Sequence, residues 1–69
     1  MPDFIEPSPE NIESMLQIYW SLNGAITERL TLAISLELMT CGYSDASREM
    51  IDCWATALLD RLVEEGSSA

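Results

Sequence analysis

Small and polar residues recur along the first half of the chain at alternating intervals of four and three. They are Glu10, Ser14, Gln17, Ser21, Gly24, Glu28, Thr31 and Ser35. This spacing follows one face of an α-helix, and the apolar residues form a wide arc on its other sides. Ser8 and Pro9 are typical of an N-cap and a first helical residue. The pattern therefore predicts one long helix over about residues 9–41.

The segment LTLAISLEL, residues 30–38, alternates almost like a half-buried strand. Leucine, alanine and glutamate are good helix formers, and the rest of the sequence offers no second strand to pair with it. We interpret the alternation as a by-product of a helix that is apolar on most sides. Asn23-Gly24 leaves an alternative open, because this dipeptide favours a turn. A break there would let the same residues close a monomeric three-helix bundle.

A second helix is predicted over about residues 45–65. Gly42 is typical of the position after a helix end and Ser44 of an N-cap, which places a short turn at 42–44. The expected buried face recurs at helical spacing: Ala46, Met50, Ile51, Trp54, Ala57, Leu58 and Leu62. The proline-containing residues 1–8 are expected to form an extended arm, and residues 66–69 a flexible tail.

The predicted fold class is all-α, an antiparallel helical hairpin. At about 1.5 Å per residue, the first helix spans roughly 50 Å and the second roughly 31 Å, so the second reaches back only to about Ser21. Apolar residues before that point then lack cover within the chain, and a chain of 69 residues seldom has a sufficient core alone. We predict a homodimeric four-helix arrangement with these candidate interface residues: Ile12, Met15, Leu16, Ile18, Tyr19, Leu32, Leu36 and Met39.

The composition argues against several classes of partner and site. Twelve acidic residues, three arginines and no lysine give a formal net charge of −9, which repels nucleic acid and anionic membranes. No apolar run is long enough to span a membrane. Histidine is absent and no CxxC spacing occurs, so we expect neither metal nor cofactor. The two cysteines, Cys41 and Cys53, are expected to be reduced thiols of a cytoplasmic protein.

Few residues are suited to catalysis. The sequence has no glycine-rich phosphate loop and no nucleophile elbow. Glu37 lies within an apolar face, where burial would make it resemble a functional carboxylate. We expect instead that it pairs with Arg29 or Arg61, or that it lies at the helix end. Cys53 has no neighbouring base on its helical face and is expected to be a structural thiol. We therefore expect no catalytic residues and no enzyme activity.

The predicted second helix carries an acidic stripe. Glu49, Asp52, Thr56, Asp60 and Glu64 recur at intervals of three, four, four and four. Like charges at i,i+4 are mildly destabilising, and only two arginines lie nearby. The stripe is either a solubilising surface or the binding face for a basic partner such as a DNA-binding domain.

Two aromatic residues are candidate anchors for a partner. Trp20 lies at the edge of the apolar arc of the first helix, and Tyr43 lies in the predicted turn. A half-exposed tryptophan is a common interface anchor. For Trp20 a second interpretation stays open, in which the N-terminal arm covers it through Phe4 or Ile5.

The chain from MPDFIEPSPENIE through ITERLTLAISLELMTCGYSDASREMIDCWATALLDRL resembles the small anti-quorum-sensing proteins of Mu-like temperate phages. The resemblance rests on length, acidity and the layout of a long helix, a short turn and a second helix. It implies a helical homodimer in the host cytoplasm that binds a LuxR-type quorum-sensing activator at its DNA-binding region and blocks promoter binding. It also implies the type IV pilus assembly ATPase as a second host target.

An alternative function comes from a different class. A small acidic helical chaperone or antitoxin would use the wide apolar arc to bind an amphipathic helix of its client protein. Sizing the purified protein discriminates between the two, because a stable dimer that is unaffected by truncation of Phe4 or Ile18 would speak against an exposed groove for a client.

Overall fold

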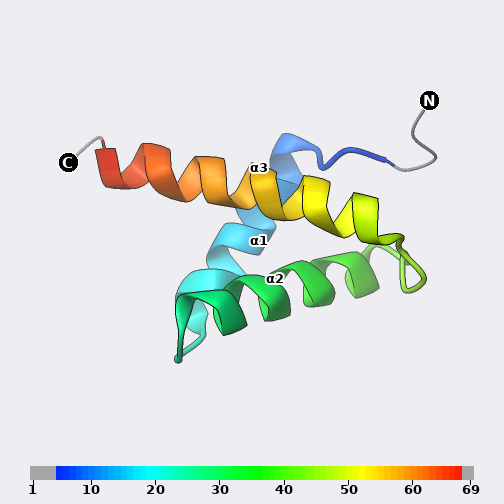
Figure 1. The fold of residues 1–69 in the computed structure, drawn as a ribbon, viewed down its shortest axis with the longest axis horizontal. Coiled ribbons are helices and arrows are strands. Elements are labelled where there is room, and N and C mark those ends of the chain that lie inside the picture. The colour runs from blue at the N-terminus through cyan, green and yellow to red at the C-terminus, as the bar shows by residue number, and fades with distance from the viewer. Residues whose placement is uncertain (1–4, 68–69) are drawn as a thin grey trace.

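Three helices and no strand make up the part of the chain that the computed structural model describes, residues 5–67. They are α1, Pro9–Ser21, α2, Ile26–Thr40, and α3, Arg48–Ser67. α2 and α3 lie side by side along the length of the molecule, and α1 runs across them from the middle of α3 to the start of α2 (Figure 1). Each helix contacts both others. The all-α class is confirmed, but the two-helix hairpin is not what the chain forms.

The long first helix predicted over residues 9–41 is wrong, because the chain breaks at 22–25. Leu22 leaves the helical conformation with extended backbone angles, and Gly24 follows with φ of +126°. Side chains strongly disfavour that backbone region, so glycine is the residue that permits the turn there. The structure has a turn at Asn23-Gly24, as in the alternative that the sequence left open. α1 therefore folds back onto the other two helices.

The reversal of α1 gives its apolar residues cover within one chain. Met15, Leu16 and Tyr19 are buried in the central core, which contradicts the premise that they need a second protomer. Trp54 and Leu58 of α3 are completely buried in the same core. The core is completed by Ala33, Ile34, Leu38 and Met50, and the half-buried Ile12 and Ile18 pack against it. Closing this core offsets the cost of breaking the helix, since burying each large side chain contributes about 1.5–3 kcal/mol.

The helix ends follow local sequence signals. α1 begins at Pro9, and the Ser8 hydroxyl accepts a hydrogen bond from the Asn11 backbone amide as its N-cap. α2 ends at Thr40, and just beyond it the amides of Gly42 and Tyr43 donate to the carbonyls of Met39 and Leu38. This is the Schellman arrangement, and Gly42 has the positive φ that it requires.

The third helix starts three residues later than the turn at 42–44 predicts. Ser47, not Ser44, is the cap, because its hydroxyl accepts a hydrogen bond from the backbone amide of Met50. The Ala46 amide instead donates to the Tyr43 carbonyl in the connecting turn. At the other end α3 continues to Ser67, so residues 66–67 are helical and not part of a tail. Residues 68–69 lie outside the described part.

The described part of the N-terminal arm, residues 5–8, is not helical. The indole nitrogen of Trp54 donates a 2.7 Å hydrogen bond to the Ile5 carbonyl oxygen. This bond satisfies the polar atom of a completely buried tryptophan and ties the arm to α3. The alternative in which Ile5 covers Trp20 is not realised, since the Ile5 carbonyl lies against Trp54 and Trp20 is 59% exposed. Phe4 lies outside the described residues.

Candidate functional site

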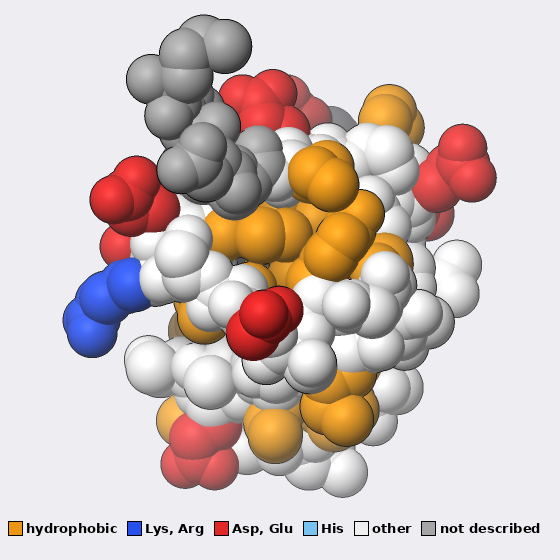
Figure 2. Space-filling view, turned by 90° about the vertical axis from the view of Figure 1, so that its right-hand side faces the viewer, with side chains coloured by type: hydrophobic (Ala, Val, Ile, Leu, Met, Phe, Trp, Pro, Cys, Tyr) orange, Lys and Arg blue, Asp and Glu red, His pale blue; other side chains and the backbone are white. Residues whose placement is uncertain are grey.

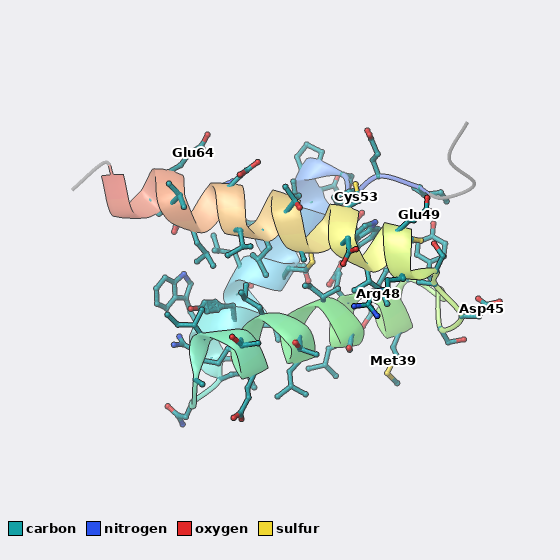
Figure 3. The ribbon with its side chains drawn as sticks, in the orientation of Figure 1. Met39, Asp45, Arg48, Glu49, Cys53 and Glu64 are labelled. Carbon is teal, nitrogen blue, oxygen red and sulfur yellow. The ribbon has the colours of Figure 1, made fainter. Side chains whose placement is uncertain are left out.

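The five residues of the predicted acidic stripe lie on one exposed side of α3. Glu49, Asp52, Thr56, Asp60 and Glu64 are all solvent-exposed, and we call this surface the acidic face. Figure 3 shows Glu49 and Glu64 on the side of α3 that faces away from α2. Because α3 is uninterrupted over its 20 residues, the face extends along almost the whole helix.

The charges of the acidic face are not neutralised by nearby arginines. Arg61 pairs with Glu13 of α1 at 3.0 Å and with Glu65 at 3.7 Å. Within residues 5–67 these are the two ion pairs, and neither involves Glu49, Asp52, Asp60 or Glu64. Four like charges thus stand on one helix without a paired cation, where their repulsion slightly destabilises the helix.

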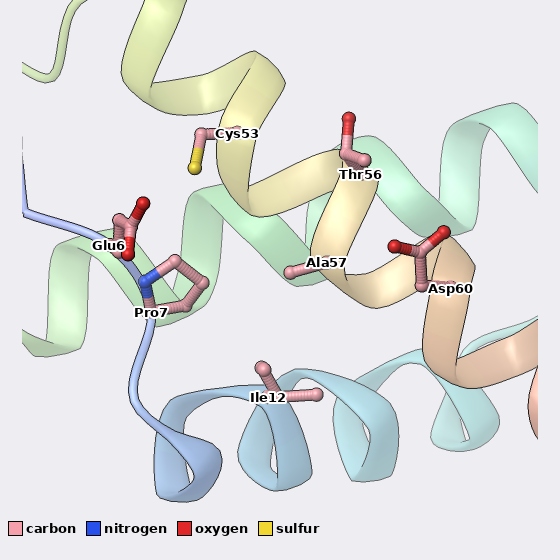
Figure 4. A pocket seen from close by; sticks show the side chains of 7 residues that line it. All are labelled: Glu6, Pro7, Ile12, Cys53, Thr56, Ala57 and Asp60. Carbon is pink, nitrogen blue, oxygen red and sulfur yellow. The ribbon is translucent and has the colours of Figure 1, made fainter.

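A groove borders the acidic face where α3 passes the start of α1. Figure 4 shows Ile12 of α1 opposite Ala57 of α3, with Glu6 and Pro7 of the arm at one end and Asp60 at the other. Its volume is about 400 Å³, and Cys53 and Thr56 complete its wall. A second hollow shares Ile12, Ala57 and Asp60 with it and continues to Arg61 and Glu64. We call the two together the α1/α3 groove.

The candidate anchors Trp20 and Tyr43 do not line this groove. Trp20 is 59% exposed and stacks on Tyr19 with ring centroids 5.1 Å apart. The Arg29 guanidinium lies 4.2 Å from the Tyr19 ring centroid and 5.5 Å from that of Trp20. Tyr43 is half-buried and meets Trp54 edge-on. Trp20 is thus an exposed aromatic surface backed by a cation, whereas Tyr43 mainly supports the core.

The predicted interface residues divide into two groups. Those of α1 lie in the core of the single chain or pack against it. Those of α2, namely Leu32, Leu36 and Met39, remain 48%, 43% and 66% exposed. They follow the i, i+4, i+7 spacing of one helix face, which we call the α2 face. Figure 3 shows Met39 on the side of α2 that faces away from α3, so this face and the acidic face lie on opposite sides of the molecule.

A second apolar area lies at the end of the molecule that carries the α2–α3 connection. A hollow there is lined by Leu38, Met39, Tyr43, Ala46 and Ile51, together with two serines. Figure 2 views this end and shows hydrophobic side chains gathered near its centre, with one acidic side chain directly beside them and others around the edge. Because Met39 belongs to both, the hollow is continuous with the α2 face.

Glu37 is buried, but neither Arg29 nor Arg61 is its partner. Its carboxylate accepts hydrogen bonds from the Ser14 hydroxyl at 2.6 Å and from the Asn11 side-chain amide at 2.9 Å. The Cys41 thiol also lies 3.7 Å from this carboxylate. Sequence reasoning missed this network, although Asn11 stands at the third helical position, where a side chain often completes a cap.

Burial is the largest cause that raises the pKa of the Cys41 thiol above its ordinary value. The negative charge of Glu37 and the hydrogen bond to it raise the pKa further, while the Asn11 amide opposes the shift. A thiol with a raised pKa is a poor nucleophile at neutral pH. Among residues 5–67, no group of three acidic, cysteine or histidine side chains is arranged to hold a metal ion.

Comparison with protein-family models, with curated proteins and with solved structures finds no match to this chain. Over the described residues, none of the three helices has both the length and the apolar character needed to cross a membrane.

Proposed function

We propose that this protein is a non-catalytic inhibitor that binds the basic, DNA-contacting surface of a transcription factor through the acidic face of α3. The observation that carries the proposal is the set of four exposed carboxylates on one helix, with no ion pair to any of them within residues 5–67. A DNA-binding surface presents arginine and lysine residues to phosphates, and a row of carboxylates is complementary to it. Binding there excludes DNA by direct competition.

The resemblance to the small anti-quorum-sensing proteins of Mu-like phages directs the proposal to a LuxR-type activator in the cytoplasm of a bacterial host. The net charge of −9 supports a basic target, because it speeds encounter with a positive surface and repels DNA itself. The type IV pilus assembly ATPase is a second proposed target, and it rests on the resemblance alone.

We propose further that two copies associate through the α2 face. Between Leu30 and Cys41 the sequence has one charged residue, Glu37, and its side chain is buried, so the surface from Leu32 to Met39 presents no charge, and Glu28 stands beside Leu32 at its one charged end. Two chains of net charge −9 repel each other least where they meet across such a surface. Because the acidic face lies on the opposite side, a dimer would present it twice.

The alternative of a chaperone or antitoxin rests on the same exposed α2 face. A client helix would lie along Leu32, Leu36 and Met39 in place of the second copy. A protein that stays monomeric at high concentration would favour this alternative over the dimeric inhibitor.

Calorimetric titration of a purified LuxR-type activator with two matched triple variants tests the role of the acidic face. One variant combines Glu49→Gln, Asp52→Asn and Asp60→Asn on the acidic face. The control combines Glu10→Gln, Glu28→Gln and Asp45→Asn, which removes the same charge from exposed positions elsewhere. We expect the first to weaken binding roughly thirtyfold or more and the control about threefold at most. Equal losses would contradict a specific role for the acidic face.

A further inference from the structure

We infer that the α1/α3 groove receives an arginine side chain of the basic partner and is the specific contact within the broader acidic face. The inference rests on the proposed function, since it names the group that the partner inserts. Its evidence is the combination of an apolar floor with a one-sided charge at the rim.

The floor of the groove is apolar. Ile12 and Ala57 face each other across it, and Pro7 closes the end near the arm. The space exists because α3 carries the small residues Cys53, Thr56 and Ala57 where it passes the start of α1. Such a surface matches the three-carbon stem of an arginine, which packs on apolar groups while its charged end stays at the rim.

The rim of the groove is negative. Glu6 and Asp60 line its larger part and Glu64 its extension. Arg61 also lines the extension, but its guanidinium already pairs with Glu13 at 3.0 Å. The groove therefore presents three carboxylates and one cation that is already paired, which favours a positively charged occupant.

Arginine fits this groove better than lysine. A guanidinium donates two parallel hydrogen bonds to one carboxylate and keeps donors for another, whereas an ammonium acts as a single compact charge. Glu6 and Asp60 lie at the two ends of the larger hollow, so a planar group with several donors can pair with the carboxylate at either end. The guanidinium is also less strongly hydrated and costs less to place beside an apolar floor.

Nuclear magnetic resonance titration of the isotope-labelled full chain with nona-arginine tests the inference. Nona-lysine and an uncharged glycine-serine peptide of the same length serve as reference probes. We expect nona-arginine to bind at low salt and to shift the amide signals of Ile12, Ala57 and Asp60 more than those of Glu49 and Asp52. Nona-lysine should bind about threefold more weakly.

Three variants separate the groove from the rest of the acidic face. Asp60→Asn should weaken nona-arginine binding roughly fivefold, and Ala57→Met, which fills the groove without changing charge, roughly tenfold. Asp52→Asn removes the same charge from the same helix but outside the groove. It should weaken nona-arginine binding about twofold at most. The amide spectrum of each variant verifies that it is folded.

The outcomes distinguish this inference from the proposed function. One outcome is salt-dependent binding that Asp52→Asn and Asp60→Asn weaken equally and that Ala57→Met does not weaken. This result would overturn the groove as the arginine site and leave the acidic face as a diffuse docking surface. Nona-arginine that binds no more tightly than the uncharged peptide at low salt would overturn the proposed function together with the inference.

Discussion

The side-chain amide of Asn11 donates a 2.9 Å hydrogen bond to the carboxylate of Glu37, and this contact joins the first turn of α1 to the last turn of α2. The amide oxygen of Asn11 accepts a hydrogen bond from the Ser8 backbone amide. One side chain therefore caps a helix and also satisfies a buried carboxylate of another helix, which fixes how α1 and α2 meet.

Asn11→Asp separates these two roles. Aspartate keeps the acceptor for the Ser8 amide but replaces the donor facing Glu37 with a second carboxylate. We expect the free energy of unfolding, measured by urea denaturation at neutral pH, to fall by about 2–3 kcal/mol. Glu10→Asp is the control, since Glu10 is exposed in the same turn. Wild-type stability in Asn11→Asp would show that the contact with Glu37 contributes little.

Gly24→Ala tests the break between α1 and α2. At φ of +126° an alanine is strained, and we expect the substitution to lower the free energy of unfolding by about 1–3 kcal/mol. Gly66→Ala is the matched control, because Gly66 is helical, has no positive φ and has open space where a methyl group would stand. If residues 9–41 formed one continuous helix, Gly24→Ala would instead stabilise the protein by about 1 kcal/mol. The sign of the change therefore decides between the two folds.

The raised pKa of Cys41 predicts a loss of stability in alkaline solution. Above pH 9, the ordinary pKa of the thiol, the unfolded chain releases this proton while the folded chain still holds it beside Glu37. The free energy of unfolding should therefore fall as the pH rises through that region. Cys41→Ser removes the titrating group, so its stability should fall less steeply over the same range. Parallel pH profiles of the two proteins would contradict the assignment.

Leu36→Glu tests association through the α2 face. Light scattering coupled to gel filtration should give twice the mass of one chain for the wild type and the mass of one chain for the variant, because the charge would be buried between two copies. Leu36 is 43% exposed within one chain, so we expect the helical content to remain. Val63→Glu is the control, since Val63 is an exposed apolar residue of α3. A wild type that is monomeric at high concentration would exclude the dimer.

Several features of the fold can be predicted from neighbouring residues alone. Ser8 with Pro9 marks the start of α1, and Gly42 marks the end of α2, because capping depends on residues within one turn. The spacing of the acidic face could be predicted as well, since α3 is one uninterrupted helix. Its role in binding remains a prediction.

The break at Gly24 could not be decided from the sequence. The polar stripe passes through Ser21, Gly24 and Glu28 in register, so a continuous and a broken helix give the same local pattern. The break is favoured because Met15 is buried in one core with residues more than thirty positions away, such as Trp54 and Leu58. The local spacing of apolar residues does not reveal such long-range packing. The α1/α3 groove depends on the same crossing of helices. In the sequence, the small residues Cys53, Thr56 and Ala57 of α3 were the one feature that could have indicated it.

Displacement of DNA is the most direct test of the proposed inhibition. Fluorescence anisotropy follows a labelled promoter fragment bound to a LuxR-type activator while this protein is added at constant salt. We expect the anisotropy to fall to that of free DNA with the wild type, and to stay near its bound value with the variant that combines Glu49→Gln, Asp52→Asn and Asp60→Asn. An activator that stays on its DNA at saturating wild-type protein, or a variant that displaces DNA as well as the wild type, would contradict inhibition through the acidic face.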